Sequence, residues 1–292
     1  MIVPDIDNIN HVGMAVRDLR DTTSRYERLG FQLTPFSPHS GAWKPGEAVQ
    51  KLNSGNRCVM FATNYLEILA SEDPAAPAPR IENFLKHHQG GCIICFNSEA
   101  VQAADQRLVA SGIKTSGVIP LQRDIDTPEG VRTAKFERMQ FAPDDSPEGY
   151  IQVARHLTPQ YIYQPRYIVH ANGCNRLNDT FVVTDDLAHF VEKYARYVGA
   201  AAQWNGDDCA IFGFALGTRL LIGTSRRMAK MLPGTLFPPV PGIVAVSFNT
   251  PDLAAQRQRL VQARVPFNEA EGRIVVPAEE ASGIAVVFDN RS

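Results

Sequence analysis

An internal repeat restricts the fold of this chain more than any other feature of its sequence. Residues 9–16 alternate in character, which is typical of a strand with one buried face. An amphipathic helical segment follows and stops at Gly30. Three further strands are expected at residues 31–35, 57–62 and 65–70. The order strand, helix, strand, strand, strand defines one βαβββ unit.

The same order recurs three more times. The later units open with expected strands at residues 92–96, 180–183 and 243–248. Their helices are expected at residues 100–110, 187–198 and 252–263. Four such units predict an α+β chain in which they pair into two similar domains. We place the first domain at residues 1–157, a linker at 158–177 and the second domain at 178–292.

Two segments of the first half interrupt this pattern. Residues 35–55 and 119–131 contain glycine and proline and are expected to be long loops. Loops of this length in compact domains often form lids or pocket walls, and disorder is the alternative. Trp43 in the first of these segments is a candidate to cap a cavity.

Composition excludes several classes of partner. The 292 residues carry a net charge of −2, and their basic side chains are scattered, so neither nucleic acid nor a membrane surface is the expected partner. The N-terminus does not have the pattern of a secretory signal, and no apolar stretch reaches the roughly 20 residues that span a bilayer. Cys92 and Cys95 lie three apart on an expected strand, where they face opposite sides and do not form a zinc or redox pair. We expect a reduced, cytoplasmic protein.

Several segments of the first half resemble the glyoxalase-like domain family of the vicinal oxygen chelate superfamily. They are NHVGMAVRDL at residues 10–19, YERLGF at 26–31, YLEILA at 65–70, and HLTP at 156–159 with HANG at 170–173. The resemblance implies two glyoxalase/dihydroxybiphenyl-dioxygenase-like domains. Each is expected to be a curved mixed sheet that forms a cup, with its helices outside. The superfamily includes isomerases, lyases, dioxygenases, epimerases and drug-sequestering proteins, so the fold leaves the function open.

The resemblance also implies a place for a metal. Metal-dependent members take their ligands from the first and last strands of two paired units. His11 and Glu67 match these places in the first unit, and both face inward because their neighbours on each strand are apolar. When the second unit is aligned with the first, Gly91 is the counterpart of His11 and Gln152 is the counterpart of Glu67. His11, Glu67 and Gln152 are therefore the candidate ligands of a divalent ion (Zn, Fe, Mn or Ni), and Glu67 is also the candidate general base.

The metal-free alternative stays open at this point, because a lone histidine on a strand is more often a hydrogen-bonded core residue than a ligand. Tyr65 and Tyr150 are inward by alternation and are candidates to contact a substrate, with plain packing as the other reading. Arg123 suits an anionic substrate, or else is a solvated loop residue. His156 shares the inward face of Gln152 but lies about 13 Å further along an extended strand.

The remaining histidines divide into two groups. His170 in the linker is a candidate to fold over the mouth of the cup. The others are expected at the surface; they are His39, His87, His88 and His189.

The second half resembles a degenerate copy of the first. The nearest counterparts of His11 there are Asn178 and Ile243. The last strands offer Arg219 or Leu220 and Ala285 or Val286, which do not form a metal-ligand set. A site is therefore expected in the first half only.

Three functions are compatible with these features. The first is a divalent-metal-dependent lyase, isomerase or oxygenase that acts on a small oxygenated metabolite. The second is a metal-free protein of the same fold that sequesters a small molecule. The third is a scaffold whose second half serves for homodimerisation.

Overall fold

The structure is a computed structural model that describes residues 5–41, 46–48, 50–73 and 75–291; Trp43 lies outside this part. Each of the four repeat units runs strand, helix, strand, strand, strand. In every unit the first strand pairs in parallel with the last. The predicted α+β fold of four βαβββ units is confirmed.

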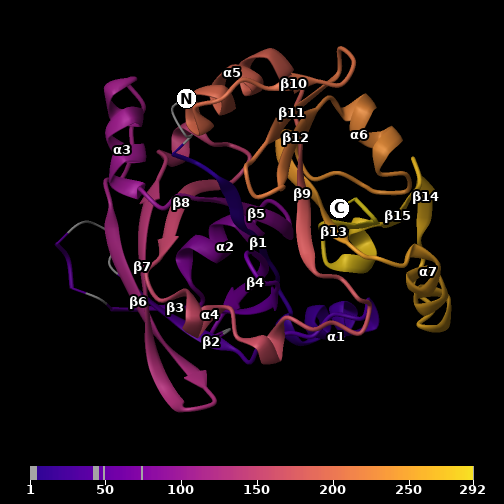
Figure 1. The fold of residues 1–292 in the computed structure, drawn as a ribbon, viewed down its shortest axis with the longest axis horizontal. Coiled ribbons are helices and arrows are strands. Elements are labelled where there is room, and N and C mark those ends of the chain that lie inside the picture. Colours follow the sequence, from indigo (N-terminus) through magenta and orange to yellow (C-terminus); the bar gives the residue numbers. More distant parts are fainter. Residues whose placement is uncertain (1–4, 42–45, 49, 74, 292) are drawn as a thin grey trace.

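Two units make up the N-terminal half, drawn in indigo to magenta in Figure 1. The first consists of β1 (Asn8–Ala15), α1 (Leu19–Arg28), β2 (Ser37–Gly41), β3 (Gln50–Met60) and β4 (Tyr65–Ser71). The second consists of β5 (Gly90–Asn97), α3 (Val101–Ala110), β6 (Ile119–Thr127), β7 (Gly130–Gln140) and β8 (Tyr150–His156). Helix α2 (Pro79–Leu85) connects the two units, and the short turn η1 (Pro143–Asp145) precedes β8.

A connection formed by α4 (Pro159–Ile162) and η2 (Pro165–Tyr167) leads into the C-terminal half. The third unit consists of β9 (Arg176–Val183), α5 (Leu187–Val198), β10 (Gln203–Trp204), β11 (Cys209–Gly213) and β12 (Arg219–Gly223). Helix α6 (Ser225–Met231) follows it. The fourth unit consists of β13 (Gly242–Asn249), α7 (Leu253–Gln262), β14 (Asn268–Ala270), β15 (Arg273–Val276), η3 (Ala278–Ala281) and β16 (Ala285–Asp289).

Local capping sets the ends of the outer helices. The Asp18 side chain accepts a hydrogen bond from the Asp21 N–H and starts α1, which ends just before Gly30 with its φ of 92°. Asp186 caps α5 in the same way, and Gly199 ends that helix with a φ of 69°. These signals were readable in the sequence.

The described strands form one continuous 16-stranded sheet. The first two units pair through antiparallel β1 and β5, and the last two pair through antiparallel β9 and β13. The two pairs meet where Ile243 of β13 lies against Gly91 of β5. Figure 1 shows the halves side by side, with the β6–β7 hairpin extending from the first.

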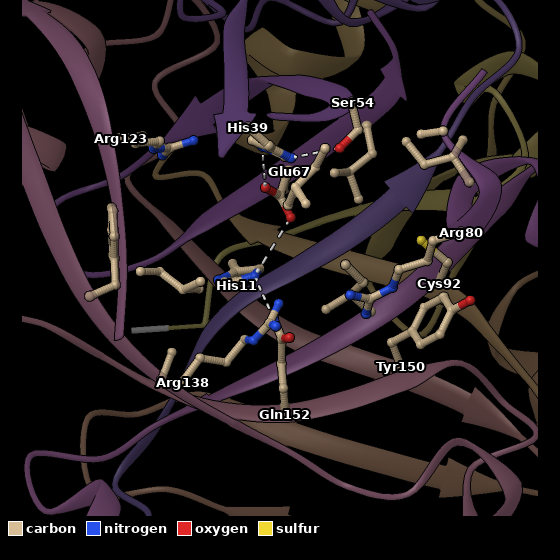
Figure 2. Close-up of a pocket in the computed structure, with 18 of the residues that line it drawn as sticks. His11, His39, Ser54, Glu67, Arg80, Cys92, Arg123, Arg138, Tyr150 and Gln152 are labelled. Atoms are coloured by element: carbon tan, nitrogen blue, oxygen red, sulfur yellow. Dashed lines mark hydrogen bonds and ion pairs between the residues drawn. The ribbon is translucent and has the colours of Figure 1, made fainter. Parts of the chain in front are cut away.

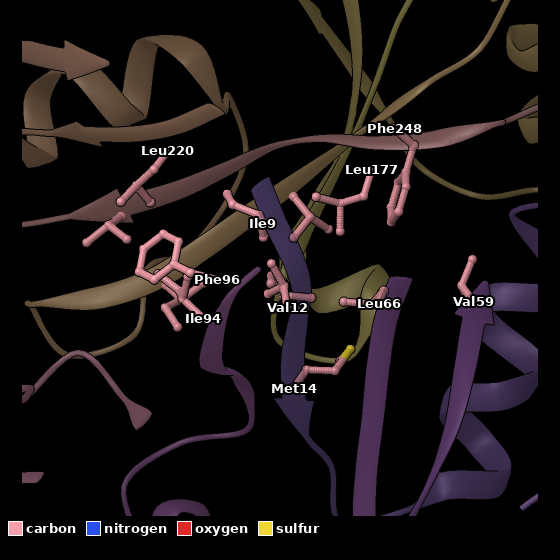
Figure 3. Packing of buried hydrophobic residues seen from close by; sticks show 14 of the residues in the cluster. Ile9, Val12, Met14, Val59, Leu66, Ile94, Phe96, Leu177, Leu220 and Phe248 are labelled. Carbon is pink, nitrogen blue, oxygen red and sulfur yellow. The ribbon is translucent and has the colours of Figure 1, made fainter. Parts of the chain in front are cut away.

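One apolar core serves both halves. The even-numbered side chains of β1, Val12 and Met14, pack there, and Figure 3 shows them beside residues of both halves: Ile94, Phe96, Leu177, Leu220 and Phe248. A buried ion pair between Lys193 of α5 and Glu148 of the second unit (2.7 Å) also joins the halves. The domain boundaries at 157 and 178 stay a prediction, because core side chains of the two halves contact each other.

Two sequence-based expectations are wrong. Residues 31–35 are not a strand, and the supposed loops at 35–55 and 119–131 contain β2, β6 and parts of β3 and β7. These strands wall a cavity and carry many polar side chains, so they do not show the apolar runs of core strands. Helix α2 was not predicted.

None of the helices in the described ranges is long and apolar enough to span a bilayer.

Candidate active site in the first half

Strands β1–β8 and helix α2 enclose a cavity of about 180 Å³, which we call the first cup. Its walls carry apolar side chains that include Leu52, Ile81, Phe84 and Leu121. A polar floor lies between these walls, and Figure 2 shows its side chains pointing toward one another. His11 and Ala15 of β1 line the cavity, whereas Val12 and Met14 face the core.

His11 and Glu67 meet on the floor. β1 pairs with β4 so that His11 lies against Tyr65 and Gly13 against Glu67, which puts both side chains on one face. The His11 Nε2 lies 3.7 Å from the Glu67 Oε2, and both residues are buried. Alternation in the sequence therefore located this pair.

The other oxygen of Glu67 has two neighbours that sequence reasoning missed. The Asn56 amide donates a hydrogen bond of 2.5 Å to Glu67 Oε1. The His39 Nε2 lies 3.7 Å from the same oxygen, so the expectation that His39 lies at the surface is wrong. His39 is on β2, within a segment taken as a loop, and recognition of that strand would have pointed to it.

Gln152 completes the floor from β8. Its Nε2 donates to the His11 Nε2 over 3.4 Å, and its Oε1 is buried without a hydrogen-bond partner in the described residues. A buried amide oxygen of this kind is uncommon and calls for a ligand or a partner.

A chain of hydrogen bonds behind His11 fixes its ring. The His11 Nδ1–H donates to Asn10 Oδ1 over 2.9 Å, and Asn10 in turn donates to Asn97 over 3.0 Å. The Nε2 lone pair is thereby directed into the cup. Burial, together with the positive charges of Arg123 and Arg138, lowers the pKa of His11 to about 3, so the imidazole is neutral at pH 7.

Strand register corrects one predicted counterpart. His11 pairs with Tyr65, and Ile93 pairs with Tyr150 in the second unit, so Ile93 and not Gly91 occupies the place of His11. Gly91 lies at the junction with β13, where a Cβ would come within 2.7 Å of the Ile243 carbonyl oxygen. Gln152 remains the counterpart of Glu67.

The four predicted substrate contacts all line the first cup. The Tyr65 ring stacks on His11 with centroids 4.6 Å apart, and Tyr150 lies beneath the guanidinium of Arg80. His156 packs against aromatic rings at the end of β8, where burial lowers its pKa to about 3. Arg123 is on β6 rather than in a loop and donates to Asn56.

His170 is the predicted site residue that lies elsewhere. Its Nδ1 accepts from the Gln32 N–H, and its Nε2 donates to the Met60 carbonyl oxygen over 2.8 Å. Both ring nitrogens are therefore used to hold the connection between the halves against the outer wall. The expectation that His170 covers the mouth of the cup is wrong.

The floor can be tested for its fit to a divalent ion. In the described ranges, no group of three or more His, Cys, Asp and Glu side chains is placed to hold a metal. The available set is mixed: an imidazole, a carboxylate and an amide, from His11, Glu67 and Gln152. The His11 Nε2 and the Glu67 Oε2 lie 3.7 Å apart, close to the roughly 3 to 3.5 Å between two ligands with bonds of about 2.0–2.2 Å. The set fits one divalent ion with positions left for a substrate.

The second half holds different residues at the same places. The register of β9 with β12 and β13 makes Asp179, rather than Asn178 or Ile243, the counterpart of His11. Leu221 and Val287 occupy the places of Glu67 and Gln152. The sequence analysis considered different residues of the second half as ligands. Asp179, Leu221 and Val287 also do not form a metal-ligand set.

Comparisons with solved structures identify the class of fold. A hypothetical protein from Staphylococcus aureus superposes with a TM-score of 0.63 at 12% identity, covering 96% of this chain and 98% of that one. A mutant of 4-hydroxymandelate synthase from Streptomyces coelicolor gives 0.59 at 11% identity, covering 98% and 92%. The Mn(II)-bound glyoxalase from Novosphingobium aromaticivorans gives 0.53 at 14% identity, covering 98% and 82%. The fold is that of the vicinal oxygen chelate proteins.

The sequence gives the family. Residues 9–198 match the model of the glyoxalase-like domain. This match covers more than half of the chain, so the protein belongs to the glyoxalase-like domain family. A search of curated proteins finds no match.

Proposed function

We propose that the protein is a divalent-metal-dependent lyase, isomerase or oxygenase that acts on a small oxygenated metabolite in the first cup. The observation that carries the proposal is the meeting of His11, Glu67 and the unpartnered amide oxygen of Gln152 on one buried floor. The fold class supports it, because similar structures include a Mn(II)-bound glyoxalase and a synthase.

His11, Glu67 and Gln152 would hold the ion, which is Zn, Fe, Mn or Ni. When bound, such an ion polarises a substrate oxygen as a Lewis acid. The chain itself supplies orientation and proton transfer. Asn10 keeps the Nε2 lone pair of His11 toward the floor, and Asn56 fixes one oxygen of Glu67.

Glu67 is the proposed general base, because it is the acidic side chain that the floor presents to a bound substrate. Tyr65 and His156 form an aromatic wall that would hold a flat part of the substrate. Tyr150 and Arg123 would bound its other sides. The apolar upper walls would exclude water from the proton transfer.

Metal content tests the proposal. We expect about one equivalent of metal per chain in protein loaded with Mn, Zn, Fe or Ni and then desalted, measured by elemental analysis. His11→Ala and Glu67→Gln should lose the metal while circular dichroism shows the fold intact. His189→Ala, a change at an exposed histidine, is the matched control. Content below about 0.1 equivalent after every loading would overturn the proposal.

A second candidate is the metal-free protein that sequesters a small molecule. It is favoured by the short hydrogen bond from Asn56, which already satisfies one oxygen of Glu67, and by the apolar upper walls of the cup. The same elemental analysis separates the two functions.

A further inference from the structure

Three arginines point into the first cup from different elements. Figure 2 shows Arg80 of α2, Arg123 of β6 and Arg138 of β7 around the floor. In the described part of the chain none of them forms an ion pair with a carboxylate. Arg80 stacks on the Tyr150 ring at 3.7 Å, and Arg123 donates to the neutral Asn56 amide at 3.3 Å.

Each guanidinium also has a donor without a partner. The Arg80 Nη2, the Arg123 Nε and the Arg138 Nε are buried and make no hydrogen bond with the described residues. Donors and charges that are removed from water without a partner are unfavourable by several kcal/mol. A site with such groups is therefore adapted to a partner that arrives from solution.

The charge balance of the cup identifies the sign of that partner. Two carboxylates line the cup: Glu67 on the floor, and Glu137 of β7, which also accepts a hydrogen bond from Gln102 of the outer helix α3. Three guanidinium groups thus share the cup with two carboxylates, which leaves an excess of positive charge.

The arrangement of the arginines indicates where an anion would lie. Figure 2 shows the side chains of Arg80 and Arg138 extending toward the floor from opposite sides. They are near enough that Arg80 lowers the pKa of Arg138, although burial is the larger cause. Two like charges that lie near each other repel, and an anion between them would stabilise both.

We infer that the first cup binds an organic anion, with its carboxylate or phosphate between Arg80 and Arg138 and its apolar part against Ile81 and Phe84. This inference rests on the proposed function and adds the substrate class. Arginine suits the role because its planar group donates two parallel hydrogen bonds to such oxygens. Sequence reasoning found Arg123 but missed Arg80 and Arg138.

Ligand-observed NMR titration tests the inference on the full chain, before and after removal of metal with EDTA. The probes are phenylacetate, phenyl phosphate and the uncharged phenylacetamide. Both anions should bind at least tenfold more tightly than the amide. A tenfold preference between the two anions would identify the natural group as carboxylate or phosphate.

Variants assign the binding to the arginines. Arg138→Met and Arg80→Met should each weaken anion binding by tenfold to a hundredfold, and Arg138→Lys should weaken it less. Arg132→Met on the same strand is the control, because Arg132 is exposed, and it should change nothing. If a Met variant does not fold, the Lys variant and the amide comparison still decide the outcome.

The outcome of the anion-binding test can be distinguished from the outcome of the metal-content test. Anion binding that persists without metal supports the inference even if elemental analysis rejects a metal site. Equal binding of phenylacetamide and phenylacetate, or unchanged binding in both Met variants, would overturn the inference while leaving the metal result intact.

Discussion

The two halves share a strand order but differ in what their concave faces contain. The first cup has His11, Glu67 and Gln152 on its floor, whereas the matching face of β9–β16, which we call the second cup, has Asp179, Leu221 and Val287. Asp179 is fully buried and forms ion pairs with Arg219, at 2.8 Å, and Arg291. Its charge is therefore neutralised within the chain.

The connecting helices complete the contrast. In the first half, α2 brings Arg80 and Phe84 to the edge of an open cavity. In the second half, α6 inserts Met228 and Met231 into an apolar cluster that fills the cup. One backbone plan thus gives a polar cavity in one half and a packed core in the other, so the site depends on a few side chains rather than on the fold.

The largest expected effect comes from copying Glu67 into the second cup. Leu221→Glu places a carboxylate in a filled apolar cluster, and we expect it to lower the free energy of unfolding by about 3–5 kcal/mol. Chemical denaturation measures the change. Leu221→Met, with a similar volume, should lower it by less than about 1.5 kcal/mol. A small effect of Leu221→Glu would mean that the second cup also admits water or an ion.

Truncation of a side chain on each connecting helix should lower the stability of the chain by different amounts in the two cups. Met228→Ala on α6 should destabilise the chain by about 2–4 kcal/mol, because Met228 is fully buried in the filled cup. Arg80→Ala on α2 should cost less than about 1 kcal/mol, because its main contact is with the Tyr150 ring. Thermal or chemical denaturation measures both variants. Equal losses would contradict the contrast between the two cups.

The hydrogen bond behind His11 should tune metal affinity. Asn10→Ala removes the acceptor that orients the ring, and we expect metal affinity to fall by about tenfold to a hundredfold, measured by competition with a chelator. Asn178 is the counterpart of Asn10 and donates to Asp289. Asn178→Ala should leave the metal affinity of the folded chain unchanged, and a similar loss in both variants would argue against a role for Asn10 in orienting His11.

The last expected effect is a difference in pH dependence. The folded pKa of His156, about 3, is below the ordinary value of 6.5, so its contribution to stability is present above pH 6.5 and is lost as the pH falls toward 3. His156→Phe should reduce the slope of stability against pH by up to about 1.4 kcal/mol per unit between pH 6 and 4. His189→Phe should not, because His189 is exposed. Unfolding free energies at three pH values decide the outcome.

Sequence alone was sufficient for the parts of the molecule that follow simple periodicity. The repeat predicted four units, and alternation put His11 and Glu67 on one face. The same period caused the error at Gly91, because an alignment shifted by two residues fits an alternating strand as well as the correct one. The pairing of β5 with β8, in which Ile93 lies against Tyr150, fixes the register.

Arg80, Arg138 and His39 could not be predicted from such patterns. Arg138 and His39 lie on wall strands that carry many polar side chains, and Arg80 lies on a short helix between units. Their convergence depends on how β2, α2 and β7 curve around the cavity, which is a property of the tertiary structure. A local pattern does not encode it.

Anomalous diffraction from a crystal soaked in Mn²⁺ tests the contrast between the halves most directly. We expect one peak, on the floor of the first cup beside His11, Glu67 and Gln152, and none at Asp179 and Leu221. A peak in the second cup, or a first cup without one at full Mn²⁺ saturation of the soak, would contradict the account.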